Sequence, residues 1–577
     1  MKKKLLSLLL LASMSISVLA GCSSAGTASD SADKAASDAG SKTDEDSSAD
    51  ETGSEDAPQT VDKITWYLSE PTFSVGIEEW GKDRMSAEIQ EKFGIEIEFV
   101  TAADDSGTQL SAYISAGDLP DVISTHAIWD SKYTDLINQM AQADMLYSYN
   151  ELLETYLTEE EQANFRKDIL NWYALGDGKT YGYPNCAYSS EDIEEGKGYL
   201  PNRCIVVRAD MLEQLGNPSM ESPEDFLNVC ERAVDEIGTY NGVDVIGLQL
   251  NENGNEAVSI VNQYFAVPWE TEDGQAYSEW TAGTNKESYA FLNEAYRRGL
   301  VLDANYTDTR EGVKEKVAAG RVFALIAAPQ DYSEAMKTLY ESDPNAYYVP
   351  VVLRNANGDD PTLGDLSGWG YQQTIITKEC AAVEKVIKFI SWLCGDEGAI
   401  QMMMGWEGET FEYLADGTMD WTEEFEAELN SNPNAKKELG INSIGLFVNP
   451  AYEMNIAPAD LSTAEGLKTW RTSDQGLKEG MDKYSYQPMQ SIADPNDPNL
   501  TKVQEEITKR DSYLTIAEAE VLTATSEEAF EAKYAEVQET LPTVCDMDLI
   551  TTYNNDNLQR AKEQLGVDYF FPPYKNK

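Results

Sequence analysis

The strongest constraint on the fold is the order of hydrophobic patterns between residues 62 and 101. The segment DKITWYLSE alternates apolar and polar residues, as a half-buried strand does. From Glu78 to Phe93 apolar residues recur at three- to five-residue steps, which predicts a helix that ends at Gly94. The segment IEIEFVTA then alternates again. A strand, a helix and a second strand in this order predict a parallel crossover and therefore an α/β fold.

Strand and helix patterns continue to alternate along the chain. NRCIVVRADMLEQLG passes from a strand into a helix, and VKEKVAAGRVFALIAAP passes from a helix into a buried strand. SPEDFLNVCERAV predicts a helix with Ser222 as N-cap, Pro223 at its first position and Asp225 as the acidic partner of the cap. A chain of 577 residues is expected to divide into at least two lobes.

The N-terminus has the pattern of an export signal. Three lysines precede an apolar run from Leu5 to Val18, which is too short to span a bilayer comfortably. The following L-A-G-C resembles the bacterial lipobox, in which the peptide is cleaved before the cysteine and that cysteine carries lipid. We therefore predict a signal peptide over residues 1–21 and lipidation of Cys22. A secreted protein with a chance cysteine is the alternative.

Residues 22–60 are predicted to form a disordered acidic linker. Beyond Cys22 the segment holds ten acidic residues, two lysines and almost nothing apolar, so it buries too little surface to offset its ordering entropy. A coil of this length reaches roughly 35 Å. The linker would hold the folded body away from the membrane.

The chain is strongly acidic, with a formal net charge of −59. This charge argues against binding to nucleic acid and against lying directly on an anionic membrane. Six cysteines follow Cys22, and their spacing leaves fifteen pairings open. Cys186 with Cys204 is the first disulfide to test, and buried free thiols are the alternative.

The residues that most enzymes need are scarce. His126 is the single histidine, which argues against His-dependent triads and multi-His metal sites, and a polar structural role is expected for it. No G-x-S-x-G or P-loop pattern is present. Paired carboxylates are easy to find by chance among 102 acidic residues. DPNDPNL and NENGNE offer oxygen ligands for calcium, but neither matches an EF-hand loop. We therefore expect a protein that is not an enzyme and has no metal site or cofactor.

Several stretches, in order, resemble one protein family. They are SAYISAGDLPDVIS, WDSKYTDLINQMAQADMLYSY, GKTYGYP, VVRADMLEQLGNPSMESPEDF, GRVFALIAAP, TKECAAVEKVIKFISWLCGDEG and GWEGETFEY. The chain from about residue 61 to 410 resembles the extracellular solute-binding proteins of bacterial ABC transporters, family 1, of the oligosaccharide type and lipoprotein subgroup. Residues from about 415 to 577 match only loosely.

The resemblance implies a type II periplasmic-binding-protein fold, in which two α/β lobes are joined by a hinge and the ligand lies in a cleft between them. The first lobe would comprise approximately residues 61–185 and 351–395. The second would comprise 204–350 and 400–577, including a helical C-terminal extension. It also implies a monomer on the extracellular face of the cell membrane whose partners are the solute and the membrane subunits of the permease.

Aromatic residues supply the predicted binding chemistry, since the chain has 11 Trp and 31 Tyr. Flat rings cover the apolar face of a sugar, and polar side chains bind its hydroxyl groups. Candidates come from predicted strand ends and loops, where open α/β sheets bind ligands. For each tryptophan, core packing is the alternative. The predicted ligand-binding residues are Trp129, Tyr183, Tyr188, Arg203, Trp269, Asp365, Trp369, Tyr371, Trp406 and Glu407.

The sequence therefore predicts a lipid-anchored binding protein that captures an oligosaccharide or similar polar solute and delivers it to an ABC importer. Other interpretations stay open. These are a binding protein for a peptide or sugar acid, a cell-surface glycoside hydrolase, and a surface adhesin with a broad apolar patch.

Overall fold

The computed structural model describes residues 60–441 and 499–574, except 71–76, 78, 105, 127–130, 186, 188–202, 364–369, 371, 416, 433, 566–567, 570 and 572–573. The chain divides into two units, Met1–Pro58 and Gln59–Lys577. The predicted signal peptide, Cys22 and nearly all of the linker lie outside the described residues. The folded body is the second unit.

The first sheet has five strands in the order β2-β1-β3-β11-β4. They are β1 (Asp62–Leu68), β2 (Ile95–Thr101), β3 (Val122–His126), β4 (Gly182–Pro184) and β11 (Gln372–Ile376). Strand β1 pairs in parallel with β2 and β3, whereas β11 is antiparallel to β3 and β4. The predicted parallel crossover is confirmed. Strand β11 comes from a distant part of the sequence and lies between β3 and β4.

The crossover helix is α1 (Arg84–Phe93), which starts later than the sequence pattern predicts. Asp83 is its N-cap, and the carboxylate of Asp83 accepts a 2.8 Å hydrogen bond from the backbone N–H of Ser86. Gly94 ends the helix in a left-handed conformation, as predicted.

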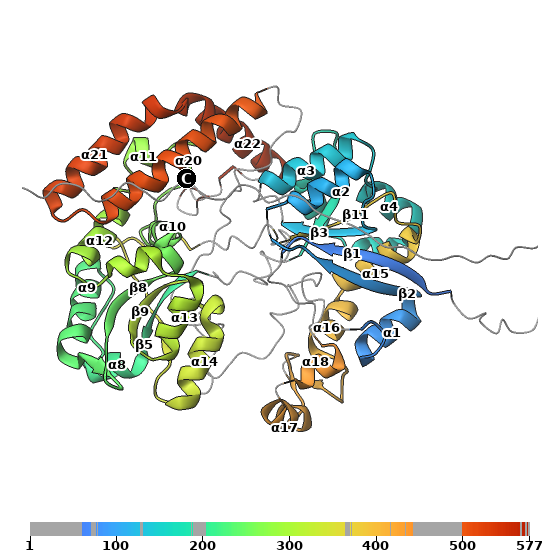
Figure 1. Cartoon of the computed structure of the whole chain (residues 1–577), viewed down its shortest axis with the longest axis horizontal. Helices are drawn as coiled ribbons and strands as arrows, with labels where there is room; N and C mark the ends of the chain where they lie inside the picture. Colours follow the sequence, from blue (N-terminus) through green and yellow to red (C-terminus); the bar gives the residue numbers. More distant parts are fainter. Residues whose placement is uncertain are drawn as a thin grey trace, which may run out of the picture. The chain divides into compact units, whose positions relative to one another are not determined.

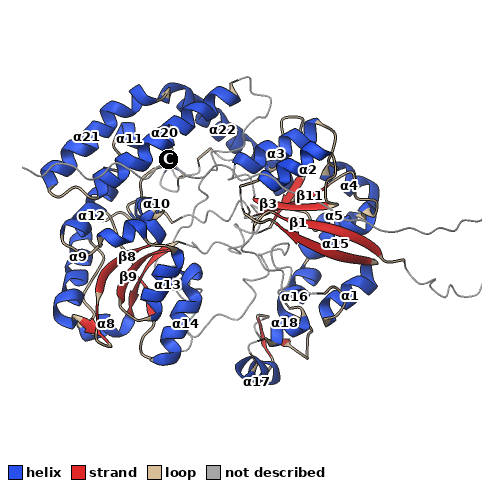
Figure 2. Cartoon of the chain, viewed as in Figure 1, coloured by secondary structure: helices blue, strands red, loops and turns tan. Residues whose placement is uncertain are grey.

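Helices cover both faces of the first sheet (Figures 1 and 2). Side chains of β1 alternate between two hydrophobic clusters, with Trp66 and Leu68 in one and Tyr67 in the other. The Trp66 cluster includes residues of α1 and of several other elements: α4 (Tyr149–Tyr156), α6 (Lys167–Trp172), α15 (Val383–Cys394) and α16 (Asp396–Met404). The Tyr67 cluster includes residues of α2 (Thr108–Ala116) and α3 (Ser131–Gln142).

Residues 399–441 also contribute to the Trp66 cluster, through side chains such as Met402 and Phe425. This segment contains β12 (Phe411–Tyr413), β13 (Met419–Trp421), α17 (Glu423–Ser431) and α18 (Ala435–Leu439). The resemblance implied that residues from about 400 onward belong to the second lobe, whereas these side chains pack with the first sheet. Helix α5 (Glu159–Ala163) lies earlier in the chain and contacts α15.

The second sheet has four strands in the order β10-β5-β9-β8. They are β5 (Cys204–Arg208), β8 (Ile246–Leu250), β9 (Val322–Ala327) and β10 (Tyr348–Pro350). Strand β8 runs parallel to β9, and β5 runs antiparallel to both β9 and β10. The three longer strands are buried along their whole length, as their near-continuous apolar sequences require.

Helices surround this second sheet as well (Figure 2). They are α8 (Ala209–Gln214), α9 (Pro223–Arg232), α10 (Ala257–Tyr264), α11 (Glu279–Ala282), α12 (Lys286–Arg297), α13 (Arg310–Ala318) and α14 (Ser333–Ser342), and a small hairpin is formed by β6 (Thr239–Tyr240) and β7 (Val243–Asp244). The predicted cap of α9 is confirmed: Ser222 accepts a 3.1 Å hydrogen bond from the Asp225 N–H, and Pro223 opens the helix.

The C-terminal region is helical, as its pattern predicts, with α20 (Leu500–Leu522), α21 (Glu527–Val544) and α22 (Met547–Leu565) drawn in red in Figure 1. Helices α20 and α21 contact α12, and Val521 and Tyr534 join the core of the second sheet. Helix α22 contributes Ile550 to that core and Leu558 to the Trp66 cluster. The predicted fold of two α/β lobes is confirmed, and the C-terminal helices contribute to the cores of both.

Four cysteines among the described residues, Cys230, Cys380, Cys394 and Cys545, are buried free thiols. Cys186 lies outside the described residues, so its pairing with Cys204 stays a prediction. Within the described part of the chain, no helix combines the length and the apolar character that crossing a membrane requires.

Candidate functional site

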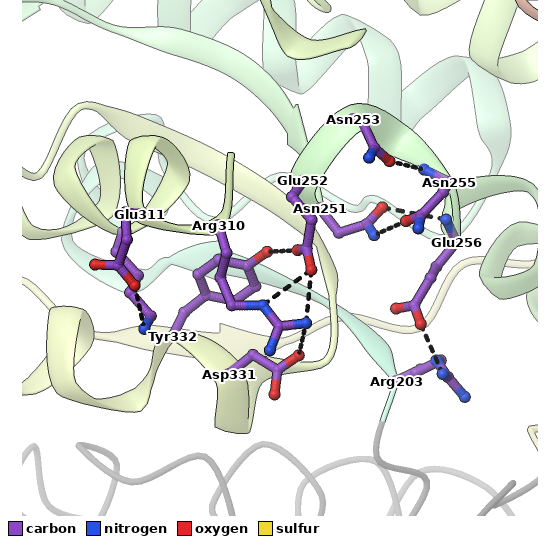
Figure 3. Close-up of polar contacts among 11 residues, drawn as sticks. Arg203, Asn251, Glu252, Asn253, Asn255, Glu256, Arg310, Glu311, Asp331 and Tyr332 are labelled. Carbon is purple, nitrogen blue, oxygen red and sulfur yellow. Dashed lines mark hydrogen bonds and ion pairs between the residues drawn. The ribbon is translucent and has the colours of Figure 1, made fainter. Parts of the chain in front are cut away.

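Polar side chains gather at one edge of the second sheet. Strands β8 and β9 are parallel, so their carboxyl ends meet at this edge, and β5 begins there because it runs the opposite way. Arg203 precedes β5, the segment from Asn251 to Glu256 follows β8, and Asp331 and Tyr332 follow β9 (Figure 3). We call this group the strand-end cluster, and it also includes Arg310 at the start of α13. Ligands of open α/β sheets bind at such edges.

Arg203 supplies hydrogen-bond donors to this cluster. Its Nη2 lies 2.7 Å from Oε1 of Glu256, which balances the guanidinium charge. The Nε and Nη1 atoms of Arg203 are buried and have no hydrogen-bond partner among the residues that the structure describes. A buried donor without a partner costs free energy, so a ligand oxygen that accepted from these atoms would stabilise the protein.

A second group centres on Glu252. Arg310 donates to Oε1 of Glu252 from Nε at 2.9 Å and from Nη2 at 2.6 Å, and the Tyr332 hydroxyl donates to Oε2 at 2.7 Å. Burial disfavours the ionised carboxylate, but these hydrogen bonds hold the pKa of Glu252 below its usual value. Asp331, whose Oδ2 lies 3.5 Å from Arg310, has a pKa raised by burial. Arg310 and Tyr332 thus hold the Glu252 carboxylate in a fixed position, with the carboxyl group of Asp331 nearby.

Asparagines fix the segment that follows β8. Asn251 Nδ2 donates to Asn255 Oδ1 at 2.5 Å, and Asn251 Oδ1 accepts from the backbone N–H of Glu256 at 3.3 Å (Figure 3). This NENGNE segment was one of two candidate sources of calcium ligands. In the described part of the chain no group of three or more His, Cys, Asp or Glu side chains is placed to hold a metal ion. The other candidate, DPNDPNL, lies mostly outside the described residues.

The corresponding edge of the first sheet is also polar. His126 ends β3, and its Nε2 lies 2.9 Å from Oε2 of Glu70, which follows β1. Gln372 begins β11 and is 1% exposed, yet in the described part of the chain neither its Oε1 nor its Nε2 has a hydrogen-bond partner. The hydroxyls of Ser69 and Thr125 are likewise buried, with no partner among the described residues. Buried polar groups are normally satisfied, so their accumulation at one edge is typical of a ligand site.

A cavity of about 630 Å³ lies between α10 and the C-terminal helices. Its wall includes the rings of Trp269, Tyr277, Trp280 and Tyr289 together with Asn255, a member of the strand-end cluster. The volume falls within the range of small-molecule sites. Flat rings beside amides and carboxyls provide surfaces for both the faces and the edges of a small polar ligand.

The loop that carries Trp269 is held in place by the C-terminal helix. Nζ of Lys562 in α22 lies 2.6 Å from Oε2 of Glu270, and it also donates to the Gly274 carbonyl at 2.7 Å. Oε1 of Glu270 accepts from the Phe571 N–H at 2.6 Å, and the Phe571 ring packs edge-on against Trp269. Both charged side chains are buried, at 6% and 0% exposed. A buried ion pair therefore fixes one wall of the cavity.

The structure places four of the sequence-predicted residues in defined surroundings. Arg203 belongs to the strand-end cluster, and Trp269 lines the cavity. Tyr183 is 7% exposed in the Trp66 cluster, where its hydroxyl accepts from the Arg166 N–H at 3.0 Å. Trp406 packs on the same cluster.

The surroundings of Trp406 differ from those of the other candidates. The Arg84 guanidinium lies 3.7 Å from the Trp406 ring centre, and the indole donates to Glu88 at 2.8 Å. Glu407, the next residue, is exposed. Thus Arg203 lies at the second sheet, and Tyr183 and Trp406 lie in the first lobe. Trp269 lines the cavity, but its ring also packs against the Trp66 cluster, as that of Trp406 does. Five candidates lie outside the described residues: Trp129, Tyr188, Asp365, Trp369 and Tyr371.

Sequence reasoning missed most of the strand-end cluster, including Glu252, Arg310 and Tyr332. It also missed Glu279 in the cavity wall. One signal was available for part of this set, because NENGNE and APQDY directly follow two buried strands. The same strand-end rule had selected Trp129.

Two α/β lobes with polar strand ends define the class of two-lobed ligand-binding proteins. A family model described as bacterial extracellular solute-binding protein matches residues 77–400, which is more than half of the chain. The chain belongs to this family. A search of curated protein sequences found no match.

Solved structures share the fold at low sequence identity. The alginate-binding protein AlgQ2 without calcium ion has a TM-score of 0.60 and 13% identity, with 86% of this chain and 98% of that one covered. The HMO-binding solute-binding protein of Bifidobacterium longum infantis gives 0.61 and 11%, with 87% and 99% covered. FusA of S. pneumoniae, in complex with kestose, gives 0.59 and 14%, with 86% and 99% covered. These similarities confirm the fold.

Proposed function

We propose that this protein is a lipid-anchored, extracellular substrate-binding protein of an ABC importer, and that it captures an oligosaccharide. The observation that carries the proposal is a set of buried polar groups at the strand ends of both sheets that have no partner among the described residues. The Gln372 amide lies at the edge of the first sheet, and the Arg203 donors lie at the edge of the second. Ligand hydroxyls would satisfy both.

Sugar chemistry suits these groups because each hydroxyl both donates and accepts a hydrogen bond. The Gln372 amide offers one acceptor and one donor group, and Arg203 offers donors only. Since Glu256 already balances the Arg203 charge, these donors match a neutral hydroxyl better than a second carboxylate. Trp269 supplies a flat face for the ring. The names of the structural neighbours, which bind alginate, HMO or kestose, add support.

The proposed mechanism is capture without chemistry. A ligand that contacts polar strand ends of both lobes binds the closed arrangement better than the open one, so it shifts the population toward closure. The permease would then recognise the closed protein. Family membership supports a binding protein rather than an enzyme.

The anchor is proposed from the sequence around Cys22, where a short apolar run ends at a lipobox-like L-A-G-C. Cys22→Ala should abolish lipid attachment and shift the protein from the membrane fraction to the medium. Retention of the variant in the membrane fraction would refute this assignment.

A binding and turnover experiment tests the main proposal. The purified protein is melted with a panel of neutral, acidic and amino oligosaccharides and with short peptides, and each mixture is also assayed for released reducing ends. We expect an oligosaccharide to raise the melting temperature without turnover, because a ligand that binds only the folded state stabilises it. Stabilisation by peptides alone would refute the oligosaccharide assignment. Released reducing ends would identify a glycoside hydrolase.

A further inference from the structure

The cavity between α10 and the C-terminal helices has an unusual charge balance. Its ionisable wall groups are Glu279, Glu518, Asp511 and Arg510, together with the hydroxyls of Tyr277 and Tyr289. Arg510 Nε donates to Asp511 at 2.8 Å, so these two charges compensate each other. Two carboxyl groups are left over.

Neither Glu279 nor Glu518 forms an ion pair with any residue that the structure describes. Glu279 accepts one hydrogen bond, from Asn262 Nδ2 at 3.1 Å, and Glu518 accepts from the indole of Trp280 at 3.3 Å. Burial raises the pKa of Glu279 to about 7, and it also raises the pKa of Glu518. The charge of Arg510 acts on Glu518 and partly offsets it, whereas burial is the one cause that shifts the pKa of Glu279. A desolvated carboxyl without a cation beside it leaves a place for a positive charge.

The aromatic rings of the same wall strengthen this interpretation. Tyr289 lies within the electrostatic reach of both carboxyls, whose charges help to raise its hydroxyl pKa after burial itself. Trp280 packs against Tyr289 with ring centres 4.5 Å apart. Rings beside carboxylates are the surroundings in which proteins hold ammonium groups, because the π face attracts a cation.

The cavity adjoins the strand-end cluster through a shared residue. Asn255 accepts a hydrogen bond from Asn251 in the cluster, and it also lines the cavity. A solute bound at the strand ends can therefore extend one substituent past Asn255. Its charged side chains are those of Glu252, Glu256 and Asp331 against Arg203 and Arg310, so the cluster does not oppose a positive ligand either.

We propose that the cavity receives a positively charged amine of the captured solute, with Glu279 as the counter-ion, and that the natural ligand is an amino-sugar oligosaccharide. This inference rests on the proposed function of oligosaccharide capture.

Calorimetric titration with a glucosamine tetramer and with the fully N-acetylated tetramer of the same linkage tests the inference. The purified protein is titrated at pH 7.5 as wild type, as Glu279→Gln and as Glu311→Gln. Glu311 is an exposed residue of α13 that pairs with Lys314, and it serves as the matched control. We expect the amine form to bind wild type and the control at least about tenfold more tightly than the acetylated form. In Glu279→Gln this preference should disappear.

Each other outcome has a distinct meaning. Equal binding of both tetramers, or tighter binding of the acetylated one, would leave oligosaccharide capture intact and overturn the amine assignment. A preference that survives in Glu279→Gln would overturn the role of this carboxyl. If neither tetramer binds, the amino-sugar assignment fails, and the wider panel above then decides whether another oligosaccharide is captured. A cooperative melting transition shows that each variant is folded.

Discussion

The buried pair of Lys562 and Glu270 offers the sharpest test of how the C-terminal helix supports the cavity. We expect Lys562→Met to destabilise the protein strongly, because it removes the cation that lies against the fully buried Glu270 carboxylate. Lys562 Nζ lies 2.6 Å from that carboxylate, and the side chains are only 6% and 0% exposed. Breaking a pair of this kind from one side costs about 3–5 kcal/mol.

The same numbers give a measurable shift in melting temperature. For a folding unit of roughly 150–250 residues, each kcal/mol lowers the melting temperature by about 2–4 °C. We therefore expect Lys562→Met to melt roughly 6–20 °C below wild type in scanning calorimetry. Adding Glu270→Gln removes the stranded charge and keeps an acceptor for the Phe571 N–H, so the double variant should recover a large part of the loss.

A surface pair provides the matched control. Lys533 lies 2.6 Å from Glu520, but these side chains are 41% and 54% exposed. Lys533→Met should therefore cost no more than about 1 kcal/mol. The reasoning is refuted if Lys562→Met melts like this control, or if the double variant is as unstable as the single one.

Three further predictions concern other parts of the chain. The free energy of unfolding of wild type should fall as the pH rises from 5 to 8, because the pKa of Glu279 is about 7 in the folded state against 4.5 in the unfolded chain. In urea unfolding, the stability of Glu279→Gln relative to wild type should therefore increase by about 2–3 kcal/mol over this range. A difference between the two proteins that does not change with pH would contradict this. Ser222→Ala should lose about 1 kcal/mol with the cap of α9, and Ser222→Thr should lose much less. Trp406→Ala should lower the free energy of unfolding by about 1–3 kcal/mol, because it removes the contacts of the indole with Arg84 and Glu88. If this variant binds oligosaccharide as tightly as wild type does, Trp406 is not part of the ligand site.

Local features of the fold were predictable from the sequence because local residues determine them. The alternation in β1 and β2, the stop at Gly94 and the cap at Ser222 all appear where the patterns place them. The start of α1 was wrong by six residues, because helical spacing extends back to Trp80 while the Asp83 side chain caps the helix. Periodicity shows that a segment is helical but not which carboxylate caps it.

Long-range packing was harder to predict. The resemblance implied approximate lobe bounds that put residues from 400 onward in the second lobe, whereas Met402 and Phe425 pack with the first sheet. In the candidate site, Arg203 and Trp269 were selected from the sequence, but Glu252 and Glu279 were not distinguishable among 102 acidic residues. What sets these two apart is burial and the neighbours they meet, such as Tyr332 and Asn262.

The position of β11 determines the order in which the sheets can form. All four strands of the second sheet lie between residues 204 and 350, so that sheet is fully encoded before Gln372 is reached. The first sheet begins at Asp62, yet it lacks its link between β3 and β4 until β11 has been synthesised. The lobe that starts first is therefore completed last, and a nascent chain ending near residue 350 would hold one finished sheet and one with a missing strand.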